Sequence, residues 1–165
     1  MSQNDPNKKR RKFLRIKDYD YSQPGDYFIT VCVKNHTNLF GYIEDQRLTL
    51  NNYGKIVVDV WRTIPQHFPN VYLDSFIVMP DHIHGIITIL PSDVGVRHAS
   101  PLPDRTYGPK SGSLGTIVGS FKSAVTKLIN KERDGTGESI WQRDYYEHII
   151  RNDKELEKIR IYIES

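Results

Sequence analysis

The segment 71–90 holds two strand-like runs that are separated only by Pro80 and Asp81. Both runs are rich in β-branched and aromatic residues, which favour strands, and a connection this short joins antiparallel neighbours. In the second run, His82 and His84 project from the same face because strand side chains alternate with a period of two. The segment therefore predicts an antiparallel strand pair with two histidines side by side on one face.

Two imidazoles at this spacing can hold one metal ion between them. Imidazole is a ligand of first-row transition metals, so His82 and His84 are candidate ligands of a divalent cation. The pair alone is also compatible with two ordinary hydrogen-bonded histidines, because no third ligand lies close by in the sequence. The metal interpretation therefore depends on the rest of the chain.

The remaining hydrophobic pattern alternates between the strand period and the helix period. We expect strands over 27–33, 40–43, 47–50 and 140–150, and helices over 52–64, 114–129 and from 153 onward. Runs of antiparallel strand, with helices on one side, predict an α+β fold.

The last helix has the clearest start signal. Asn152 can cap it, and Glu155 at the third helical position gives a box-like start. Its apolar stripe consists of Leu156, Ile159 and Ile163. Tyr162 lies at the edge of that stripe.

A chain of 165 residues is long enough for one domain with its own core. We assign 1–18 to a flexible basic arm and 19–165 to a single domain with a long loop at 91–113. The arm contains a basic run and a further arginine: Lys8, Lys9, Arg10, Arg11, Lys12 and Arg15. Such a run is either a solvated tail or a phosphate-binding one, and we assign it to nucleic acid.

The single cysteine, Cys32, lies within an apolar run and is expected to be a small core residue. One cysteine excludes an internal disulfide and is typical of a reducing compartment. The sequence has no N-terminal apolar region and no apolar stretch long enough for a membrane helix. We therefore expect a cytoplasmic protein with no membrane partner.

Three separated motifs resemble one family. They are residues 80–85 (PDHIHG), residues 19–30 (YxYxxPGxYFIT) and residues 141–152 (WQRxYYEHxIRN). In this order they are similar to the repeat-associated (REP-associated) single-tyrosine transposases of the HUH superfamily, named for histidine–hydrophobic–histidine. The similarity extends from about residue 19 to residue 165.

The resemblance implies cleavage and rejoining of single-stranded DNA at hairpin or palindromic repeats. His82 and His84 would hold Mg²⁺ or Mn²⁺ on the scissile phosphate, and a helical tyrosine would form a covalent 5′-phosphotyrosine intermediate. It also implies a ferredoxin-like antiparallel sheet of about five strands, with helices packed mainly on one face. Relatives include monomers and homodimers, so the oligomeric state stays open.

The family's nucleophile lies about eleven residues after the Arg-Asn pair that starts the last helix, which implies Tyr162. Tyr145 and Tyr146 lie on a predicted strand and are interpreted as packing or base-stacking residues. The family's third metal ligand lies four positions after the tyrosine, at position 166, whereas the sequence here ends at Ser165. On this pattern we expect weak metal binding, and no residue is assigned as a general base.

Two other function classes compete with this one. A non-catalytic module for single-stranded nucleic acid would use the basic arm and the aromatic strands. A metal-dependent hydrolase, in which water attacks, needs more ligands than the sequence offers. Lys122 and Lys127 on the helix over 114–129 are further candidates for DNA contact, although lysines there are also typical of a solvated face.

The other histidines receive no catalytic assignment. His36, His67 and His98 are interpreted as surface or loop residues. His148, beside Glu147, is interpreted as structural, with DNA contact as the alternative.

Overall fold

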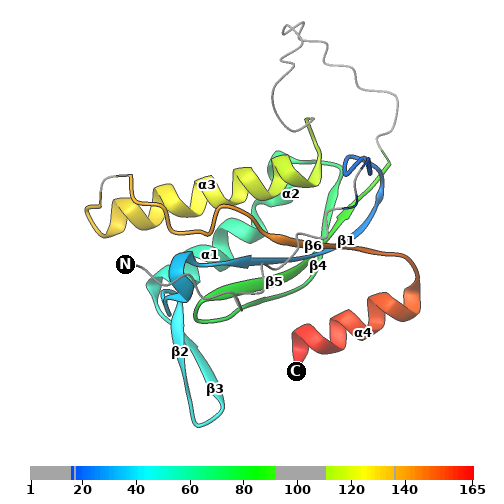
Figure 1. Ribbon diagram of the computed structural model, residues 1–165. Helices are drawn as coiled ribbons and strands as arrows, with labels where there is room; N and C mark the ends of the chain where they lie inside the picture. The colour runs from blue at the N-terminus through cyan, green and yellow to red at the C-terminus, as the bar shows by residue number, and fades with distance from the viewer. Residues whose placement is uncertain (1–15, 17, 92–110, 136) are drawn as a thin grey trace, which may run out of the picture.

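The computed structural model of the protein describes residues 16, 18–91, 111–135 and 137–165 (Figure 1). The predicted basic residues from Lys8 to Arg15, and His98, lie outside the described residues. So does most of the predicted loop at 91–113. The assignments made for them stay predictions.

Four strands form the central sheet: β1 (Gly25–Cys32), β4 (Val71–Val78), β5 (His82–Ile89) and β6 (Tyr146–Ile150). Their order is β4-β5-β1-β6, and every neighbouring pair is antiparallel. Helix α1 (Asn52–Arg62) connects β1 to β4, and α3 (Leu114–Glu132) connects β5 to β6. This βαββαβ arrangement is the ferredoxin-like fold, which confirms the predicted α+β class.

The sheet has one strand fewer than the five that were expected. Strands β2 (Gly41–Glu44) and β3 (Arg47–Leu50) pair with each other as a separate two-stranded sheet, which projects from the body of the protein (Figure 1). The two short helical segments, η1 (Lys34–His36) and α2 (Ile64–His67), lie in connections.

The expected strand over 140–150 begins only at Tyr146. Upstream of it, Trp141 makes an isolated bridge to Val33. The carbonyls of Gln142 and Arg143 accept hydrogen bonds from the ammonium of Lys122, at 2.8 and 3.0 Å. The backbone NH of Gln142 still donates to the carbonyl of Cys32 on β1 at 2.9 Å, but continuous strand pairing begins only at Tyr146.

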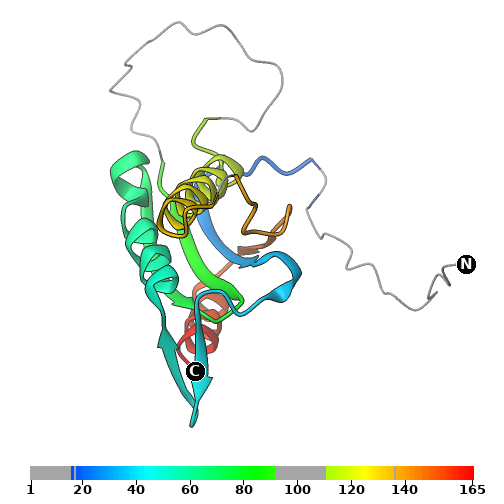
Figure 2. The same ribbon diagram turned by 90° about the vertical axis from the view of Figure 1, so that its left-hand side faces the viewer.

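Helices cover both faces of the sheet (Figures 1 and 2). Helices α1 and α3 lie on one face, over the main core that includes Ile83 and Ile87 of β5. Helix α4 (Asp153–Glu164) lies on the opposite face. There Phe28, Ile86, Ile150 and Ile163 form a second, smaller apolar cluster. Because the alternation of β5 aims its histidines at the α4 face, this second layer positions the site.

Gly85 follows the histidine pair because a larger residue would not fit there. A β-carbon at Gly85 would lie 2.6 Å from the indole ring of Trp61 on α1. That ring also stacks on Phe76 of β4, with centroids 4.3 Å apart. The glycine lets a tryptophan close directly on the strand that carries the histidines.

The predicted cap at Asn152 is confirmed, and helix α1 is capped in the same way by Asn51. The side chain of Asn51 accepts from the backbone NH of Gly54 at 3.0 Å, and that of Asn152 from Glu155 at 2.9 Å. Cys32 was expected in the core but is half-buried at the end of β1. It lies opposite His82 in the sheet, on the face that carries the site. Among the described residues, no helix is both long and apolar enough to span a bilayer.

Candidate active site

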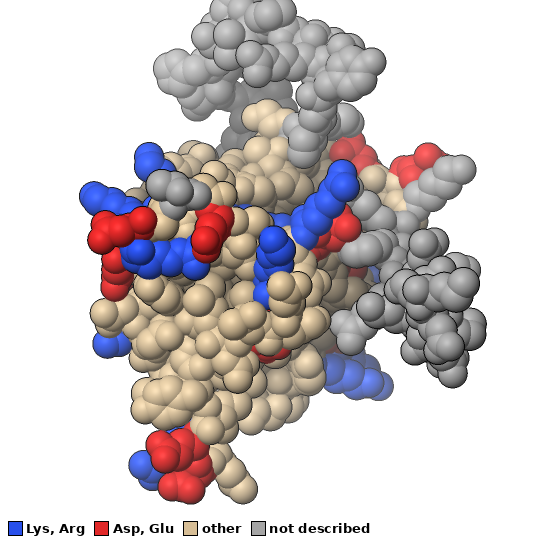
Figure 3. Space-filling view, turned by 60° about the vertical axis from the view of Figure 1, so that its left-hand side comes forward, with Lys and Arg blue, Asp and Glu red and all other residues tan. Residues whose placement is uncertain are grey.

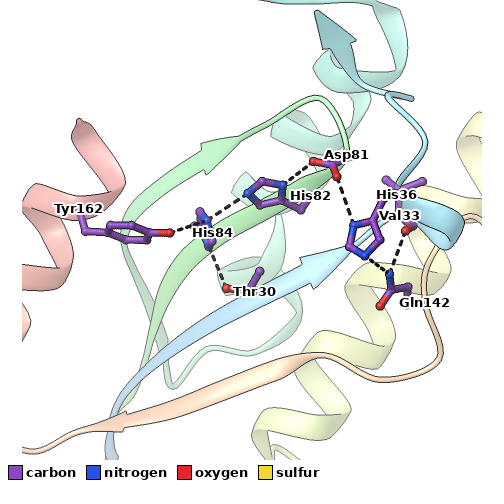
Figure 4. Close-up of polar contacts among 8 residues, drawn as sticks. All are labelled: Thr30, Val33, His36, Asp81, His82, His84, Gln142 and Tyr162. Carbon is purple, nitrogen blue, oxygen red and sulfur yellow. Dashed lines mark hydrogen bonds and ion pairs between the residues drawn. The ribbon is translucent and has the colours of Figure 1, made fainter. Parts of the chain in front are cut away.

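The two histidines converge on one point of the α4 face. His82 and His84 are half-buried on β5, and their Nε2 atoms lie 3.1 Å apart (Figure 4). Two imidazole nitrogens at this spacing are candidate ligands for one divalent cation. The alternation of β5 thus has the consequence that the sequence predicted.

A polar partner holds the other nitrogen of each ring. Nδ1 of His84 contacts the hydroxyl of Thr30 on β1 at 2.8 Å, and Nδ1 of His82 contacts the carboxylate of Asp81 at 2.6 Å. A carboxylate accepts, so His82 donates from Nδ1, which leaves Nε2 as the nitrogen that could bind a metal. Metal-binding histidines are typically oriented by such outer partners.

The ionisation of the site suits metal ligands. Burial, with nearby His82 as a second cause, lowers the pKa of His84 to about 4, so its imidazole is neutral at pH 7. Burial alone would raise the pKa of Asp81, but hydrogen bonds from His82 and His36 bring it below its ordinary value. Histidine binds a metal cation as a neutral imidazole, so the state of His84 is compatible with a ligand role.

Tyr162 reaches this site from the last helix. Its hydroxyl lies 3.4 Å from Nε2 of His84, although the two residues are 78 positions apart in the chain (Figure 4). The side chain is 58% exposed, whereas Ile163 beside it is 2% exposed and packs against the sheet. Its ring meets Phe28 edge to face, at 6.3 Å between centroids. The hydroxyl is therefore both held near the histidines and open to a substrate.

Polar contacts with strand β4 fix helix α4 in place. The guanidinium of Arg160 donates two hydrogen bonds to Asp74, at 3.0 and 2.6 Å. Ser75 donates to Glu164 at 3.1 Å. These contacts flank Tyr162 on its own helix and add to the packing of Ile163.

Two imidazole nitrogens fit a divalent cation, and the described part of the chain offers no larger donor set. Within the described residues, no group of three or more His, Cys, Asp or Glu side chains could hold a metal ion. The remaining positions around a cation would be available to water and phosphate oxygens, which are preferred by Mg²⁺ and Mn²⁺.

A further histidine belongs to the polar network of the site. His36 was interpreted as a surface residue, and it is exposed, but its Nδ1 contacts Asp81 at 3.2 Å. Its Nε2 lies 3.1 Å from the amide nitrogen of Gln142. No sequence pattern points to this contact, because Asp81 lies 45 residues away from His36.

Comparison with known proteins finds two relatives in one organism. No protein-family model matches the chain. An uncharacterised protein of Haemophilus influenzae is 40% identical over 158 residues, which cover 94% of this chain and 87% of that protein. A second protein of the same organism, described as "Putative REP-associated tyrosine transposase", is 26% identical over 145 residues, which cover 87% of this chain and 70% of that protein.

A solved structure of a REP-associated tyrosine transposase bound to a REP hairpin has the same fold. Its TM-score is 0.58 at 19% identity, over 87% of this chain and 66% of that one. The chain therefore has the fold of a REP-associated tyrosine transposase and is similar in sequence to a protein described as one.

The tyrosines expected from this family resemblance occupy different places. Tyr162 lies at the histidine pair. Tyr145 packs against the main core, and Tyr146 lies on β6, two strands away from His84. Tyr146 is 45% exposed on the face of the histidines, and its ring lies edge to face with Phe28, at 6.2 Å between centroids. Their proposed roles stay predictions.

The remaining candidate residues lie away from the histidine pair. Lys127 is exposed on α3, whereas the ammonium of Lys122 is bound to two backbone carbonyls and burial lowers its pKa. His148 contacts Glu155 at 2.7 Å at the start of α4, in agreement with its structural interpretation. His67 is an exposed residue of α2.

Proposed function

We propose that this protein cleaves and rejoins single-stranded DNA through a covalent bond between Tyr162 and the 5′-phosphate. His82 and His84 would hold Mg²⁺ or Mn²⁺ at the scissile phosphate. The observation that carries this proposal is the 3.4 Å approach of the Tyr162 hydroxyl to Nε2 of His84, on the side where both Nε2 atoms meet.

The proposed reaction is a transesterification with balanced bonds. The Tyr162 oxygen forms a bond to phosphorus, and the bond from phosphorus to the 3′-oxygen breaks. The products are a 5′-phosphotyrosine and a free 3′-hydroxyl, which can reverse the reaction with the same or another strand. The phenolic proton leaves to solvent, since Tyr162 is 58% exposed, and the departing 3′-oxygen takes a proton from water.

A bound divalent cation would supply positive charge to the phosphate and its leaving oxygen. The chain's own residues supply alignment. Thr30 and Asp81 hold the two imidazoles, while Arg160 and the apolar cluster around Ile163 hold the helix of Tyr162. Correct placement of a nucleophile contributes a large share of the rate in such reactions.

The proposed substrate is single-stranded DNA that flanks hairpin or palindromic repeats. The solved relative, which is bound to a REP hairpin, supports this class of partner. The exposed ring of Tyr146, on the same sheet face as His84, supports contact with an unpaired base.

Both halves of the proposed site come from one chain. Tyr162 and His84 meet within a single molecule, which supports cleavage without a partner subunit. A mixture of Tyr162→Phe and His84→Ala variants should then form no covalent product. Recovery of product in the mixture would indicate a site shared between two subunits.

The direct test is incubation with a labelled hairpin oligonucleotide and Mn²⁺, followed by denaturing electrophoresis. The wild type should form a covalent adduct, and Tyr162→Phe should abolish it while binding persists. Tyr72→Phe, which alters another exposed tyrosine, is the matched control and should form adduct normally. Adduct formation by Tyr162→Phe at the wild-type yield would show that the nucleophile is another residue.

The same assay separates catalysis from binding alone. A non-catalytic binding module would hold the oligonucleotide equally well in EDTA and form no adduct under any metal condition. Free cleaved ends without an adduct would instead indicate attack by water.

A further inference from the structure

A groove of about 610 Å³ lies between helix α3 and the segment 137–143 that precedes β6. Its lining contains four cationic residues and no acidic one. The cations are Lys122, Lys127, Lys131 and Arg143. Lys and Arg side chains are visible along this face in Figure 3, with carboxylates beside them. The lining itself therefore favours an anionic occupant.

Hydrogen bonds to α3 hold the walls of this groove in place. At one end, the amide of Asn130 donates to the carbonyl of Glu138 at 3.0 Å, and Arg133 pairs with the Glu138 carboxylate at 3.1 Å. At the other end, the indole of Trp141 donates to the carbonyl of Lys122 at 3.2 Å. The side chain of Lys122 is half-buried, and its ammonium donates to two carbonyls of the opposite wall. It therefore links the two walls of the groove.

The other three cationic residues of the groove are exposed to solvent. Lys127, Lys131 and Arg143 are all exposed, and they come from both walls of the groove. The carboxylate of Glu138 is paired with Arg133, and that of Asp144 interacts electrostatically with Lys122. Cations on opposite walls of an open groove suit a chain of phosphates better than a single small anion.

The groove is connected to the proposed active site by an unbroken series of contacts. From Tyr162 the series passes through His84, His82 and Asp81 to His36, and then to Gln142. Gln142 is one of the groove's lining residues. Gln142 thus lies between His36 and the groove, where it could be contacted by a strand that passes from the histidine pair around the sheet.

We propose that this groove binds the sugar–phosphate backbone of the DNA strand that extends beyond the cleavage site. This inference rests on the proposed function and adds a second contact region to it. Lys127, Lys131 and Arg143 would contact phosphates, without reading bases, and so would increase affinity for longer substrates irrespective of the added sequence.

The test compares a short oligonucleotide, limited to the cleavage site, with one extended by single-stranded DNA on both sides. The variant K127Q/K131Q/R143Q should bind the extended DNA on the order of 10- to 100-fold more weakly than the wild type at 0.1 M salt. The plot of log K against log salt concentration should become less steep, with its slope reduced in magnitude by about two. This is the change expected when three contacts to single-strand phosphates are lost. Binding of the short oligonucleotide should be nearly unchanged.

The control variant K55Q/R62Q/K158Q removes the same charge from exposed residues outside the groove. Like the wild type, this control variant should bind the extended oligonucleotide more tightly than the short one. An equal loss in both variants would mean that net charge alone is responsible and would overturn the proposal. The proposal would also be overturned if the groove variant bound the extended DNA as tightly as the wild type does.

Adduct formation on the short oligonucleotide distinguishes the two proposals. If the wild type and the groove variant both form the Tyr162 adduct, the proposed chemistry stands whatever the groove does. If the wild type forms no adduct but the groove variant loses the gain from extension, the groove binds DNA and the proposed chemistry is wrong.

Discussion

The guanidinium of Arg160 grips the carboxylate of Asp74 with two hydrogen bonds, of 3.0 and 2.6 Å, across 86 residues of sequence. Arg160 lies two positions before Tyr162 on helix α4, and Asp74 lies on the outer strand β4. The pair therefore fixes the height and rotation of the helix that presents the proposed nucleophile to His84.

Replacement of Asp74 by Asn should slow adduct formation about tenfold, because small displacements of a nucleophile reduce rate steeply. The loss should appear in the maximal rate and not in DNA affinity, which is the distinction between positioning and binding. Single-turnover adduct kinetics measure it. Lys154→Gln, at an exposed position of the same helix, should react as the wild type does. If Asp74→Asn formed the adduct at the wild-type rate, Asp74 would have no role in positioning Tyr162.

Stability should depend on pH through the same pair. The hydrogen bonds from Arg160 are the largest cause that lowers the pKa of Asp74 below its ordinary value. A carboxyl whose pKa is lower in the folded state contributes its stabilisation fully above the unfolded pKa of about 3.9, and loses it as pH falls through the folded pKa. Urea unfolding between pH 6 and pH 3 should show this loss in the wild type. The loss should be smaller in Asp74→Asn, and identical pH profiles would contradict the assignment.

Thr30→Val should weaken Mn²⁺ binding about 10- to 100-fold, since outer partners orient metal-binding imidazoles. The hydroxyl of Thr30 contacts Nδ1 of His84 at 2.8 Å, and valine removes it without loss of bulk. Calorimetric titration with Mn²⁺ measures the effect. Thr88→Val is the matched control, because Thr88 lies on the same face of β5 but donates to Asp26 at 2.6 Å. Equal affinities in both variants would exclude an orienting role for Thr30.

Gly85→Ala should lower the free energy of unfolding by about 1–3 kcal/mol, the usual range for overpacking. The new methyl group would lie 2.6 Å from the Trp61 ring, which is itself packed against Phe76 and cannot simply withdraw. Chemical denaturation measures the change. Gly119→Ala, where a β-carbon meets nothing within 4 Å, should instead stabilise helix α3 by up to about 1 kcal/mol. If Gly85→Ala were as stable as the wild type, the Trp61 side chain would be able to move away from the new methyl group.

Tyr146→Ala should weaken binding of single-stranded DNA by about 1–3 kcal/mol, the usual contribution of one stacked base. Its ring is 45% exposed beside Phe28, on the face of the histidines. Fluorescence anisotropy with a short oligonucleotide measures the affinity. Tyr42→Ala alters a comparably exposed ring, 52% exposed, on the separate hairpin and should bind normally. If both variants bind the oligonucleotide with equal affinity, Tyr146 does not stack on a DNA base.

Local patterns of the sequence predicted much of the fold and the placement of the histidine pair, whereas the family resemblance singled out Tyr162. The period of two in 82–89 placed both histidines on one face, and the stripe of α4 placed Tyr162 at the edge beside buried Ile163. The Asn152 cap marked the start of that helix to the residue. These features depend on neighbouring residues along one strand or helix, so a single sequence contains the information.

Contacts between distant segments account for the differences. The sheet has four strands because the 41–50 hairpin pairs with itself, and the segment before β6 is shared between β1 and Lys122 of α3. His36 joins the site through Asp81, and no period relates the two. Each outcome depends on which side chains meet across the fold, which local propensity does not specify.

By itself, the sequence determined that two imidazoles share one face of a strand and that a tyrosine lies beside the apolar stripe of a capped helix. Only the tertiary structure decided that this helix packs on the histidine face, where Asp74 and Ile163 hold it and the Tyr162 hydroxyl reaches His84. The physical reason is one of range. Alternation and capping act over a few bonds of one segment, whereas the meeting of nucleophile and ligands requires apolar burial and ion pairing between segments that the chain itself keeps far apart.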